Sequence, residues 1–231
     1  MDSIHLSPRL KAVADFVPLN ARLADIGSDH AYLPVNLLLN DKISHAIVGE
    51  VAKGPLDNAH HELKKRHLLA HADVRLANGL AAINETDNVD TVTIAGMGGI
   101  LISNILNAGK KQEKTFKTLV LQPNTDEQIV RRWLAAQDYQ IIAETIVQEE
   151  SHFYEIIAAV VGEQQQQLSD LDLIFGPYLR VEKTATFVAK WQKESERITL
   201  IFNQLKAAGK SDTDAYRQWQ LRYNQIQAAI S

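Results

Sequence analysis

Acidic and amide side chains occur at the ends of three successive apolar runs, where they could bind one nucleoside. Asp25 lies in an apolar run that turns at Gly27. Glu50 ends the next run, 23 residues after Gly27, close to the spacing at which a carboxylate meets ribose hydroxyls in nucleotide-binding α/β folds. Asn78, followed by Gly79, ends a third run with an amide that can hydrogen-bond the rim of an adenine. Each residue alone is typical of an ordinary turn, but together they predict a nucleoside site.

The turn after the first run favours a cationic ligand over a phosphate. Dinucleotide-binding enzymes need the pattern G-x-G-x-x-G to receive a pyrophosphate, and only its first glycine, Gly27, is present. Asp29 would repel a phosphate. S-adenosylmethionine carries a sulfonium and an ammonium group and no phosphate, so we expect it to be the cofactor. The alternative for the turn is an incidental strand-to-helix connection capped by an aspartate, with no ligand. Among enzymes, a nicotinamide-dependent dehydrogenase is the weakest alternative, because two of the three glycines of its phosphate loop are missing.

Two further loops follow the fourth and fifth apolar runs. Residues 95–99 read A-G-M-G-G, and their three glycines let two ligands approach the backbone. We therefore include Gly96 and Met97 in the predicted cofactor site, with a plain strand-to-helix connection as the alternative. Residues 122–124 read Q-P-N, in which the proline restricts the loop and the two amides could read the edge of a base.

These loops need a sheet to position them. Apolar, β-rich runs alternate with segments of helical spacing, which is typical of βαβ units and a mostly parallel sheet. The predicted strands are Ala21–Ile26, Ala46–Glu50, Val74–Ala77, Thr91–Ala95, Thr118–Gln122, Tyr139–Gln148 and Phe153–Val161. The predicted helices are Tyr32–Leu39, Pro55–Leu69, Ile100–Ala108 and Asp126–Gln137. Only residues 149–152 separate the last two strands, so these strands form a hairpin and one of them is antiparallel.

After a polar stretch at residues 162–167, the apolar spacing becomes heptad-like. One seam comprises Val181, Thr184, Val188, Trp191, Ser195, Ile198, Phe202 and Leu205, and a second comprises Tyr216, Trp219, Tyr223, Ile226 and Ile230. Gly209 and Asp212 lie between the seams as a helix breaker and an N-cap. We predict a domain of residues 1–162 and a C-terminal domain of residues 163–231 that forms an antiparallel helical hairpin.

Composition limits the class of protein. The chain has no cysteine, which excludes disulfides and thiolate metal sites. Its first residues are not typical of a signal peptide, and no run approaches the roughly 20 apolar residues of a membrane helix. We expect a cytoplasmic protein with no membrane association. The eight histidines show no ligand spacing supported by carboxylates, so no metal site is predicted.

The net charge of −4 does not by itself favour a nucleic-acid partner. Residues 163–231 carry nine Lys and Arg against eight Asp and Glu, so the acidic excess lies in residues 1–162. Basic clusters occur at residues 64–66, 110–117 and 131–132, but such runs are more typical of solvated helix faces.

The motifs together resemble one family of bacterial enzymes, the tRNA adenine-N1 methyltransferases that modify position 22. The similarity is carried by D-I-G-S-D-H-A-Y at residues 25–32, Gly49-Glu50, A-G-M-G-G at residues 95–99, N-G-L at residues 78–80 and Q-P-N at residues 122–124. Residues 176–179, G-P-Y-L, look like that family's junction into a C-terminal coiled-coil domain. The resemblance implies a class I Rossmann-like methyltransferase fold, S-adenosylmethionine as methyl donor and tRNA as partner.

By the same resemblance, each motif residue acquires an expected role. The cofactor set is Asp25, Gly27, Glu50, Asn78, Gly79, Gly96 and Met97, of which Met97 also faces the base. The set that faces or reads the base is Asp29, His30, Tyr32, Gln122, Pro123 and Asn124. Family members commonly carry aspartate at the position of Asn78, which is the one departure from the pattern. Asparagine can still hydrogen-bond adenine.

Methylation of N1 leaves adenine positively charged, which a carboxylate could stabilise. We hypothesise that Asp29 is this carboxylate, with His30 and Tyr32 orienting the base and with Asp25 as the alternative. N1 lies on the Watson–Crick edge, so the adenine must be unpaired or flipped. The basic residues Arg180, Lys183 and Lys190 make the tail a candidate RNA grip, with self-association or simple capping as alternatives.

Two other functions stay open at this point. One is a methyltransferase acting on another RNA or on a small molecule, with the tail as a lid. The other is a non-catalytic RNA-binding scaffold, against which the intact set of Asp25, Gly27 and Glu50 argues. The Asn-Pro-Pro-Tyr motif of enzymes that methylate exocyclic amines is absent after the fourth strand, which disfavours that acceptor. The oligomeric state is open, with a monomer favoured.

Overall fold

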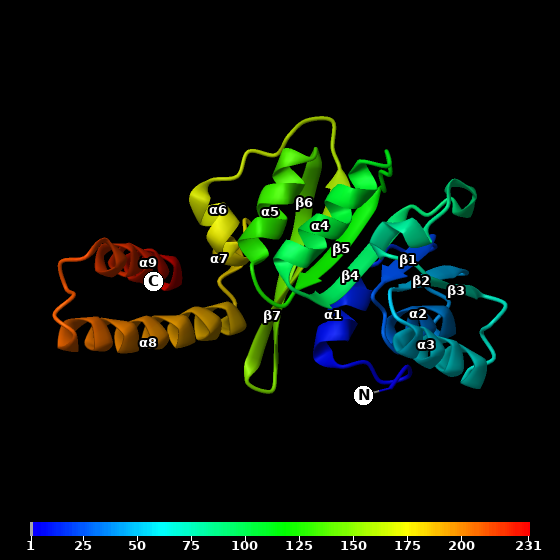
Figure 1. The fold of residues 1–231 in the computed structure, drawn as a ribbon, viewed down its shortest axis with the longest axis horizontal. Coiled ribbons are helices and arrows are strands. Elements are labelled where there is room, and N and C mark those ends of the chain that lie inside the picture. Colours follow the sequence, from blue (N-terminus) through cyan, green and yellow to red (C-terminus); the bar gives the residue numbers. More distant parts are fainter. Residues whose placement is uncertain (1) are drawn as a thin grey trace.

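The computed structural model describes residues 2–231 and has a seven-stranded sheet at its centre (Figure 1). The strand order is β3-β2-β1-β4-β5-β7-β6, and β7 alone runs antiparallel to the others. The strands are β1 Leu23–Ile26, β2 Ala46–Glu50, β3 Ala72–Leu76, β4 Thr91–Met97, β5 Thr118–Pro123, β6 Tyr139–Glu149 and β7 His152–Val161. The predicted mostly parallel sheet and its closing hairpin are confirmed.

Helices cover both faces of this sheet. One face carries α1 Pro8–Phe16, α2 Tyr32–Leu39 and α3 Lys53–Lys65, and the other carries α4 Gly99–Lys110, α5 Glu127–Ala136 and the short 3-10 helix η1 Gly79–Ala82. A second 3-10 helix, η2, spans Glu85–Asp87. Two separate apolar cores result, one on each side of the sheet. Burial on both faces explains why β1, β2 and β5 are apolar almost throughout.

Some boundaries in this part of the chain differ from the prediction, and one helix was not predicted. Helix α3 ends at Lys65 rather than Leu69, because His67 adopts a left-handed backbone conformation with φ 58°. Strand β3 begins two residues earlier than predicted, at Ala72. Helix α1 was not predicted, although Ser7 accepts a hydrogen bond from Leu10 N as its N-cap and Pro8 occupies its first turn.

The strand register brings the carboxyl ends of β1, β2 and β4 together. Ile26, the last residue of β1, lies opposite Gly49 of β2 on one side and Ile94 of β4 on the other. From β1 the chain continues to β2 and β3 on one side, and only later fills the other side with β4 and β5. Open α/β sheets bind ligands in the crevice at such a reversal of strand order. The predicted site residues therefore lie at the carboxyl-terminal edge of the sheet, where such a ligand binds.

The chain after β7 forms four helices, α6 Asp170–Phe175, α7 Leu179–Glu182, α8 Ala185–Ala207 and α9 Asp214–Ile230. Figure 1 shows α8 and α9 side by side, projecting away from the sheet, and they contact each other. Phe175, Phe187, Trp191 and Ile226 form a third apolar core, which Ile146 of β6 joins. The predicted helical hairpin is present, and it is docked on the sheet rather than separate from it.

Details of the predicted tail are wrong. Val181 does not belong to the first seam, because it lies in α7 with 74% of its surface exposed. Thr184 is the N-cap of α8, where its hydroxyl accepts a hydrogen bond from Phe187 N at 3.2 Å. Thr213, not Asp212, caps α9 by accepting from Tyr216 N. Helices α6 and α7 were not predicted, since each is too short to show an apolar period.

Among residues 2–231, no helix has both the length and the apolar character needed to cross a lipid bilayer.

Candidate active site

The turn after β1 is built around Gly27. Its φ of +74° lies in the left-handed region, and a Cβ at this position would stand 2.0 Å from Cε of Met97. Any side chain would therefore displace Met97, which reaches across from the end of β4. The close approach of these two loops explains why the turn needs glycine here.

Asp25 lies beneath this turn and is only 4% exposed. One carboxylate oxygen accepts from the Ser28 hydroxyl at 2.5 Å and the other from the Thr93 hydroxyl at 2.6 Å. Burial raises the pKa of Asp25, and these two hydrogen bonds oppose the rise. Its carboxylate ties the turn to β4, so Asp25 forms the floor of the site. Thr93 and Ser28 were not singled out from the sequence, because single hydroxyls carry no recognisable pattern.

Glu50 connects the end of β2 to the same turn. Its Oε1 accepts a hydrogen bond from Asp29 N at 2.5 Å. Burial raises the pKa of Glu50, the Asp29 amide opposes this, and the charges of Asp25 and Asp29 raise it further. A carboxylate has about four lone-pair sites, so Glu50 can still accept from two ribose hydroxyls.

Asp29, His30 and Tyr32 form the rim of the site. The rings of His30 and Tyr32 stack with centroids 5.1 Å apart and planes at 14°. His30 Nε2 lies 3.7 Å from Asp29 Oδ2, and 65% of the Asp29 side chain is exposed. Asp29 has φ 59°, a conformation that aspartate and asparagine tolerate better than most residues. The rim therefore offers a flat aromatic surface beside an accessible carboxylate.

Asn78 and Gly79 stand at the end of β3, beside β2. The backbone N–H of Ala77 donates to the carbonyl of Glu50 at 2.8 Å, which brings this loop next to the ribose-binding candidate. Asn78 is exposed and precedes η1 without capping it through its side chain. Its amide is thus oriented by the backbone alone and is accessible to a ligand.

The predicted base-reading role of Gln122 does not fit its position. Gln122 is fully buried, and its Oε1 accepts from Gly96 N at 3.0 Å. Its Nε2 donates to Asn124 Oδ1 at 3.0 Å, and Asn124 Nδ2 in turn donates to the Gly96 carbonyl at 2.8 Å. The two amides hold both sides of Gly96, whose φ is +82°. Pro123 is buried beside Met97 in the β4–β5 register.

Arg9 enters the same site from α1 and was not predicted to belong to it. Its Nη1 donates to Gln122 Oε1 at 2.7 Å, and its guanidinium lies over the ring of Tyr154 with its carbon 5.4 Å from the ring centre. An isolated arginine near the N-terminus has no spacing relation to the strand ends, so only the packing of α1 against the sheet reveals it.

A cleft of about 240 Å³ lies at the carboxyl ends of β1 and β4, and Glu50, Asn78, Gly79 and Met97 are not among the residues that line it. Six predicted site residues line it, namely Asp25, Gly27, Asp29, His30, Tyr32 and Gly96. The residues present fit S-adenosylmethionine. The tight Gly27 turn admits a close ligand, the carboxylates suit its cationic groups, and Glu50 stands where ribose hydroxyls are expected.

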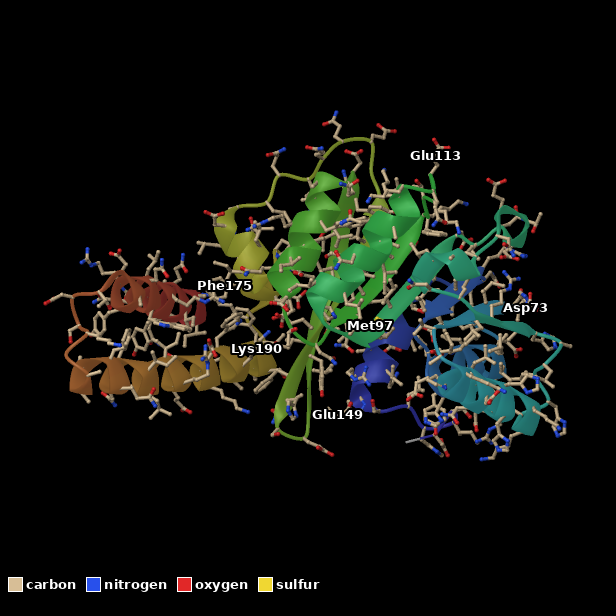
Figure 2. The ribbon with its side chains drawn as sticks, viewed as in Figure 1. Asp73, Met97, Glu113, Glu149, Phe175 and Lys190 are labelled. Carbon is tan, nitrogen blue, oxygen red and sulfur yellow. The ribbon has the colours of Figure 1, made fainter. Side chains whose placement is uncertain are left out.

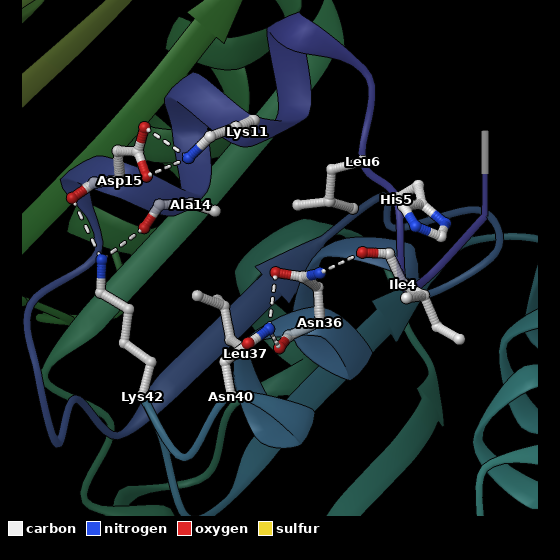
Figure 3. Close-up of a pocket in the computed structure, with 10 residues that line it drawn as sticks. All are labelled: Ile4, His5, Leu6, Lys11, Ala14, Asp15, Asn36, Leu37, Asn40 and Lys42. Carbon is white, nitrogen blue, oxygen red and sulfur yellow. Dashed lines mark hydrogen bonds and ion pairs between the residues drawn. The ribbon is translucent and has the colours of Figure 1, made fainter.

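A larger groove of about 470 Å³ between α1 and α2 contains none of the predicted site residues (Figure 3). Its two lysines are already engaged. Lys42 Nζ donates to the carbonyls of Ala14 and Asp15 at the end of α1, and Lys11 pairs with the Asp15 carboxylate at 3.1 Å. The Lys42 contacts fasten α1 to the loop after α2, whereas the Lys11–Asp15 pair lies within α1.

The three basic residues predicted to contact RNA lie at the junction with the tail, and they differ in accessibility. Lys183 is exposed, and Arg180 is partly exposed with its Nε 2.5 Å from Asp172 Oδ1. The prediction is wrong for Lys190, whose Nζ donates to Glu127 and Glu155, both at 2.6 Å, in the interior of the junction (Figure 2). Burial alone would lower the pKa of Lys190, but the two carboxylates raise it above its usual value.

Within residues 2–231, no group of three or more His, Asp and Glu side chains is placed to hold a metal ion.

Comparison with known proteins agrees with this arrangement along most of the chain. The family model described as TrmK, tRNA (adenine(22)-N(1))-methyltransferase, matches residues 23–231. The Bacillus subtilis tRNA (adenine(22)-N(1))-methyltransferase is 40% identical over 222 residues, which cover 94% of this chain and 92% of that protein.

Solved structures are similar over the same length. Mycoplasma capricolum TrmK, solved with S-adenosylhomocysteine, has a TM-score of 0.86 at 30% identity and 97% coverage of both chains. A Streptococcus pneumoniae candidate tRNA (m1A22) methyltransferase, solved with S-adenosylmethionine, has a TM-score of 0.90 at 40% identity, covering 98% of this chain and 100% of that one. The chain therefore belongs to the tRNA (adenine(22)-N(1))-methyltransferase family.

Proposed function

We propose that this protein transfers a methyl group from S-adenosylmethionine to N1 of the adenine at position 22 of tRNA. The observation that carries the proposal is the acidic cleft at the carboxyl ends of β1 and β4, in a chain whose residues 23–231 match the family model. The relatives solved with S-adenosylmethionine and with its demethylated product support the same cofactor here.

The residues of β1 to β3 would bind the cofactor. When bound, S-adenosylmethionine supplies an electrophilic methyl group on a sulfonium. Glu50 would accept hydrogen bonds from the ribose hydroxyls, and Asn78 would bind the adenine rim. Asp25 holds the Gly27 turn in shape through Ser28 and Thr93, so the turn is organised before any ligand arrives.

The rim residues would position the target base. The stacked pair of His30 and Tyr32 offers an aromatic face on which adenine can lie. The lone pair of N1 forms the new N–C bond as the S–C bond breaks, so the positive charge passes from sulfur to the adenine ring. Asp29, exposed beside the stack, would stabilise that charge in the transition state and product.

Access to N1 requires the base to leave its stack. The Watson–Crick edge is hidden in a paired base, and extruding a nucleotide costs a few kcal/mol. The exposed rim of His30, Tyr32 and Asp29 beside the cofactor cleft can receive a single extruded nucleoside, whereas a paired base cannot present N1 to it. We therefore propose that the enzyme acts on a flipped or unpaired adenine.

A transfer assay tests the proposed substrate. Unmodified bacterial tRNA carrying adenine at position 22 should accept labelled methyl groups, and the same tRNA with guanine there should accept none, because guanine N1 is protonated. Equal incorporation into both tRNAs would overturn the choice of position 22. Transfer only to a small molecule or another RNA would support the alternative substrates.

We further propose that residues 163–231 form the RNA-binding domain and that the protein works in the cytoplasm, where tRNA is found. Helices α6 and α7 contact α5 and β6, so this domain rests on the sheet near the junction. Arg180 and Lys183 border an apolar groove of about 390 Å³ that α6 and α7 form with α9. Such a cationic border suits RNA phosphates.

Lys183→Glu should weaken tRNA use without affecting cofactor binding. Removal of one phosphate contact and the added negative charge should raise KM for tRNA about 10-fold and flatten its dependence on salt. Steady-state kinetics at several salt concentrations would measure both effects. Lys111→Glu, the same charge change at the exposed C-terminal end of α4, is the matched control. Equal KM values for the two variants would exclude Lys183 from the RNA contact.

A further inference from the structure

The tip of the β6–β7 hairpin lies between the cleft and the tail. Figure 1 shows this hairpin projecting beyond the other strands, between α1 and α8. On the α1 side, the Glu149 carboxylate accepts a hydrogen bond from Arg9 N at 3.1 Å (Figure 2). On the α8 side, Lys193 Nζ donates to the Ser151 carbonyl at 2.7 Å. The tip is therefore held from both sides, by a helix that lines the cleft and by a helix of the tail.

The two faces of this hairpin have different neighbours. Side chains alternate between the faces of a strand, so Phe153 lies on one face of β7, and His152 and Tyr154 lie on the other. Phe153 packs against the apolar core of the tail. Val147, which is opposite Tyr154 in the register, packs against the core that contains the buried residues of α1. His152 and Tyr154 therefore share the face that is turned toward α1.

A row of flat groups runs along this face from the cleft to the tip. Arg9 lines the cleft, and its guanidinium carbon lies 5.4 Å from the centre of the Tyr154 ring. The ring of His152 comes next, with its centroid 6.2 Å from that of Tyr154 and the two planes at 34°. Tyr154 is partly exposed and His152 is exposed. The row thus ends in an accessible aromatic ring beside the turn of the hairpin.

An unstacked RNA base fits the exposed end of this row. Extrusion of the target adenine leaves the neighbouring bases without one stacking partner. Aromatic side chains, histidine included, bind such bases through their flat faces. A tRNA that contacts both the tail and the cleft would pass the hairpin tip, which contacts α1 and α8. The carboxylate of Glu149, opposite His152 in the register, would repel a phosphate, so the base rather than the backbone would face His152.

We propose that His152 stacks on the base of a nucleotide next to the extruded adenine, so that the hairpin tip is a further tRNA contact between the cleft and the tail. The inference rests on the proposed function, since only a tRNA with its adenine at the rim of the cleft would place that nucleotide here. The hydrogen bonds of Glu149 and Ser151 fix the backbone on both sides of the turn before RNA arrives. A preformed platform of this kind reduces the entropy lost on binding.

Two substitutions at His152 isolate the stacking contact. His152→Ala removes the ring and should raise KM for tRNA about 10-fold, within the usual range for the loss of one stacked base. His152→Phe keeps a flat ring without the imidazole nitrogens and should keep KM within about 2-fold of the unchanged protein, because stacking needs only the aromatic face. Both variants should retain the salt dependence of KM, since no phosphate contact is lost. Calorimetry should show unchanged binding of S-adenosylhomocysteine in both.

His60→Ala is the matched control, because it removes an exposed histidine from α3, which packs on β2 and β3 at the opposite end of the sheet. It should leave KM for tRNA unchanged, and thermal unfolding should show that all variants fold. An unchanged KM in His152→Ala would overturn the proposal. An equal rise in KM for His152→Ala and His152→Phe would also overturn it, since the contact would then be polar.

Binding of fluorescently labelled tRNA, followed by anisotropy, repeats the comparison without turnover. The affinity should fall about 10-fold in His152→Ala and be recovered in His152→Phe. If the unchanged protein binds tRNA but transfers no methyl group, the proposed reaction fails, and the binding series still decides whether His152 stacks on RNA. The failure of the two proposals can therefore be told apart.

Discussion

Asp29→Asn should lower kcat about 10- to 100-fold while leaving the affinity for S-adenosylhomocysteine within about 2-fold of the unchanged protein. Asparagine has the same shape and also tolerates the left-handed backbone at this position, where φ is 59°. The hydrogen bond from the backbone of residue 29 to Glu50 would persist. Only the negative charge beside the His30–Tyr32 stack is removed. Single-turnover transfer to tRNA would measure the effect.

Two comparison variants separate this effect from a loss of cofactor. Glu50→Ala should weaken S-adenosylhomocysteine binding strongly, because it removes the acceptor for the ribose hydroxyls and for Asp29 N. Asp25→Asn tests the other carboxylate, which is buried and organises the turn. Unchanged turnover in Asp29→Asn would exclude Asp29 as the charge-stabilising group. A pure loss of turnover in Asp25→Asn, with the turn intact, would then point to Asp25.

Glu155→Gln should destabilise the protein by about 3 kcal/mol or more, because it leaves the buried Arg131 and the mostly buried Lys190 without their shared partner. Glu155 is fully buried, pairs with Arg131 and accepts from Lys190 Nζ at 2.6 Å. Burial alone would raise the pKa of Glu155, but the charges of Lys190 and Arg131 lower it below its usual value. A chain of this length loses roughly 2–4 °C of Tm per kcal/mol, so Tm should fall by about 10 °C.

The same substitution at an exposed ion pair provides the control. Glu194 pairs with Arg197 at 2.6 Å on α8, and more than half of the Arg197 side chain is exposed. Exposed pairs contribute at most about 1 kcal/mol, so Glu194→Gln should shift Tm by only a few degrees. Thermal unfolding followed by circular dichroism would compare the two variants. Equal Tm values would mean that the buried network does not stabilise the junction.

This network also shows how firmly the tail is attached. Arg131 of α5 donates to Glu144 of β6 at 2.7 Å and to the Leu173 carbonyl of α6 at 3.2 Å. Glu144 in turn accepts from the backbone N–H of Tyr178 at 3.0 Å. Charged contacts thus cross the proposed boundary at residues 162 and 163. A truncation meant to test the RNA-binding role should keep α6 and α7, because their removal would expose buried charges.

The parallel part of the fold was predictable because its strands are buried on both faces. Such strands read as short, continuous apolar runs, and the residues at or just after the end of each run fall at the same edge of the sheet. This is why Asp25, Glu50 and Asn78 could be assigned to one site before their positions were known. The short linker at residues 149–152 also left a hairpin as the only connection, as the antiparallel β7 confirms.

Contacts made across the fold were not predictable from spacing. Arg9 reaches the cleft because α1 packs under β5, β6 and β7, and nothing in the order of residues relates it to the strand ends. Lys190 looked like a surface lysine on a helix, but α8 turns it toward Glu127 and Glu155. Gln122 looked available for a base, whereas Gly96 and Arg9 occupy its amide oxygen. Whether such a side chain is free to bind a ligand depends on polar contacts between residues far apart in the sequence.

Identification of the methylated nucleoside tests the central claim most directly. The protein should be incubated with S-adenosylmethionine and tRNA carrying adenine at position 22, and the digested product should be analysed by chromatography and mass spectrometry. Reverse transcription should locate the modification, since a methyl group on N1 blocks pairing. The proposal predicts 1-methyladenosine at position 22 and at no other position. N6-methyladenosine, or 1-methyladenosine elsewhere in the tRNA, would contradict it.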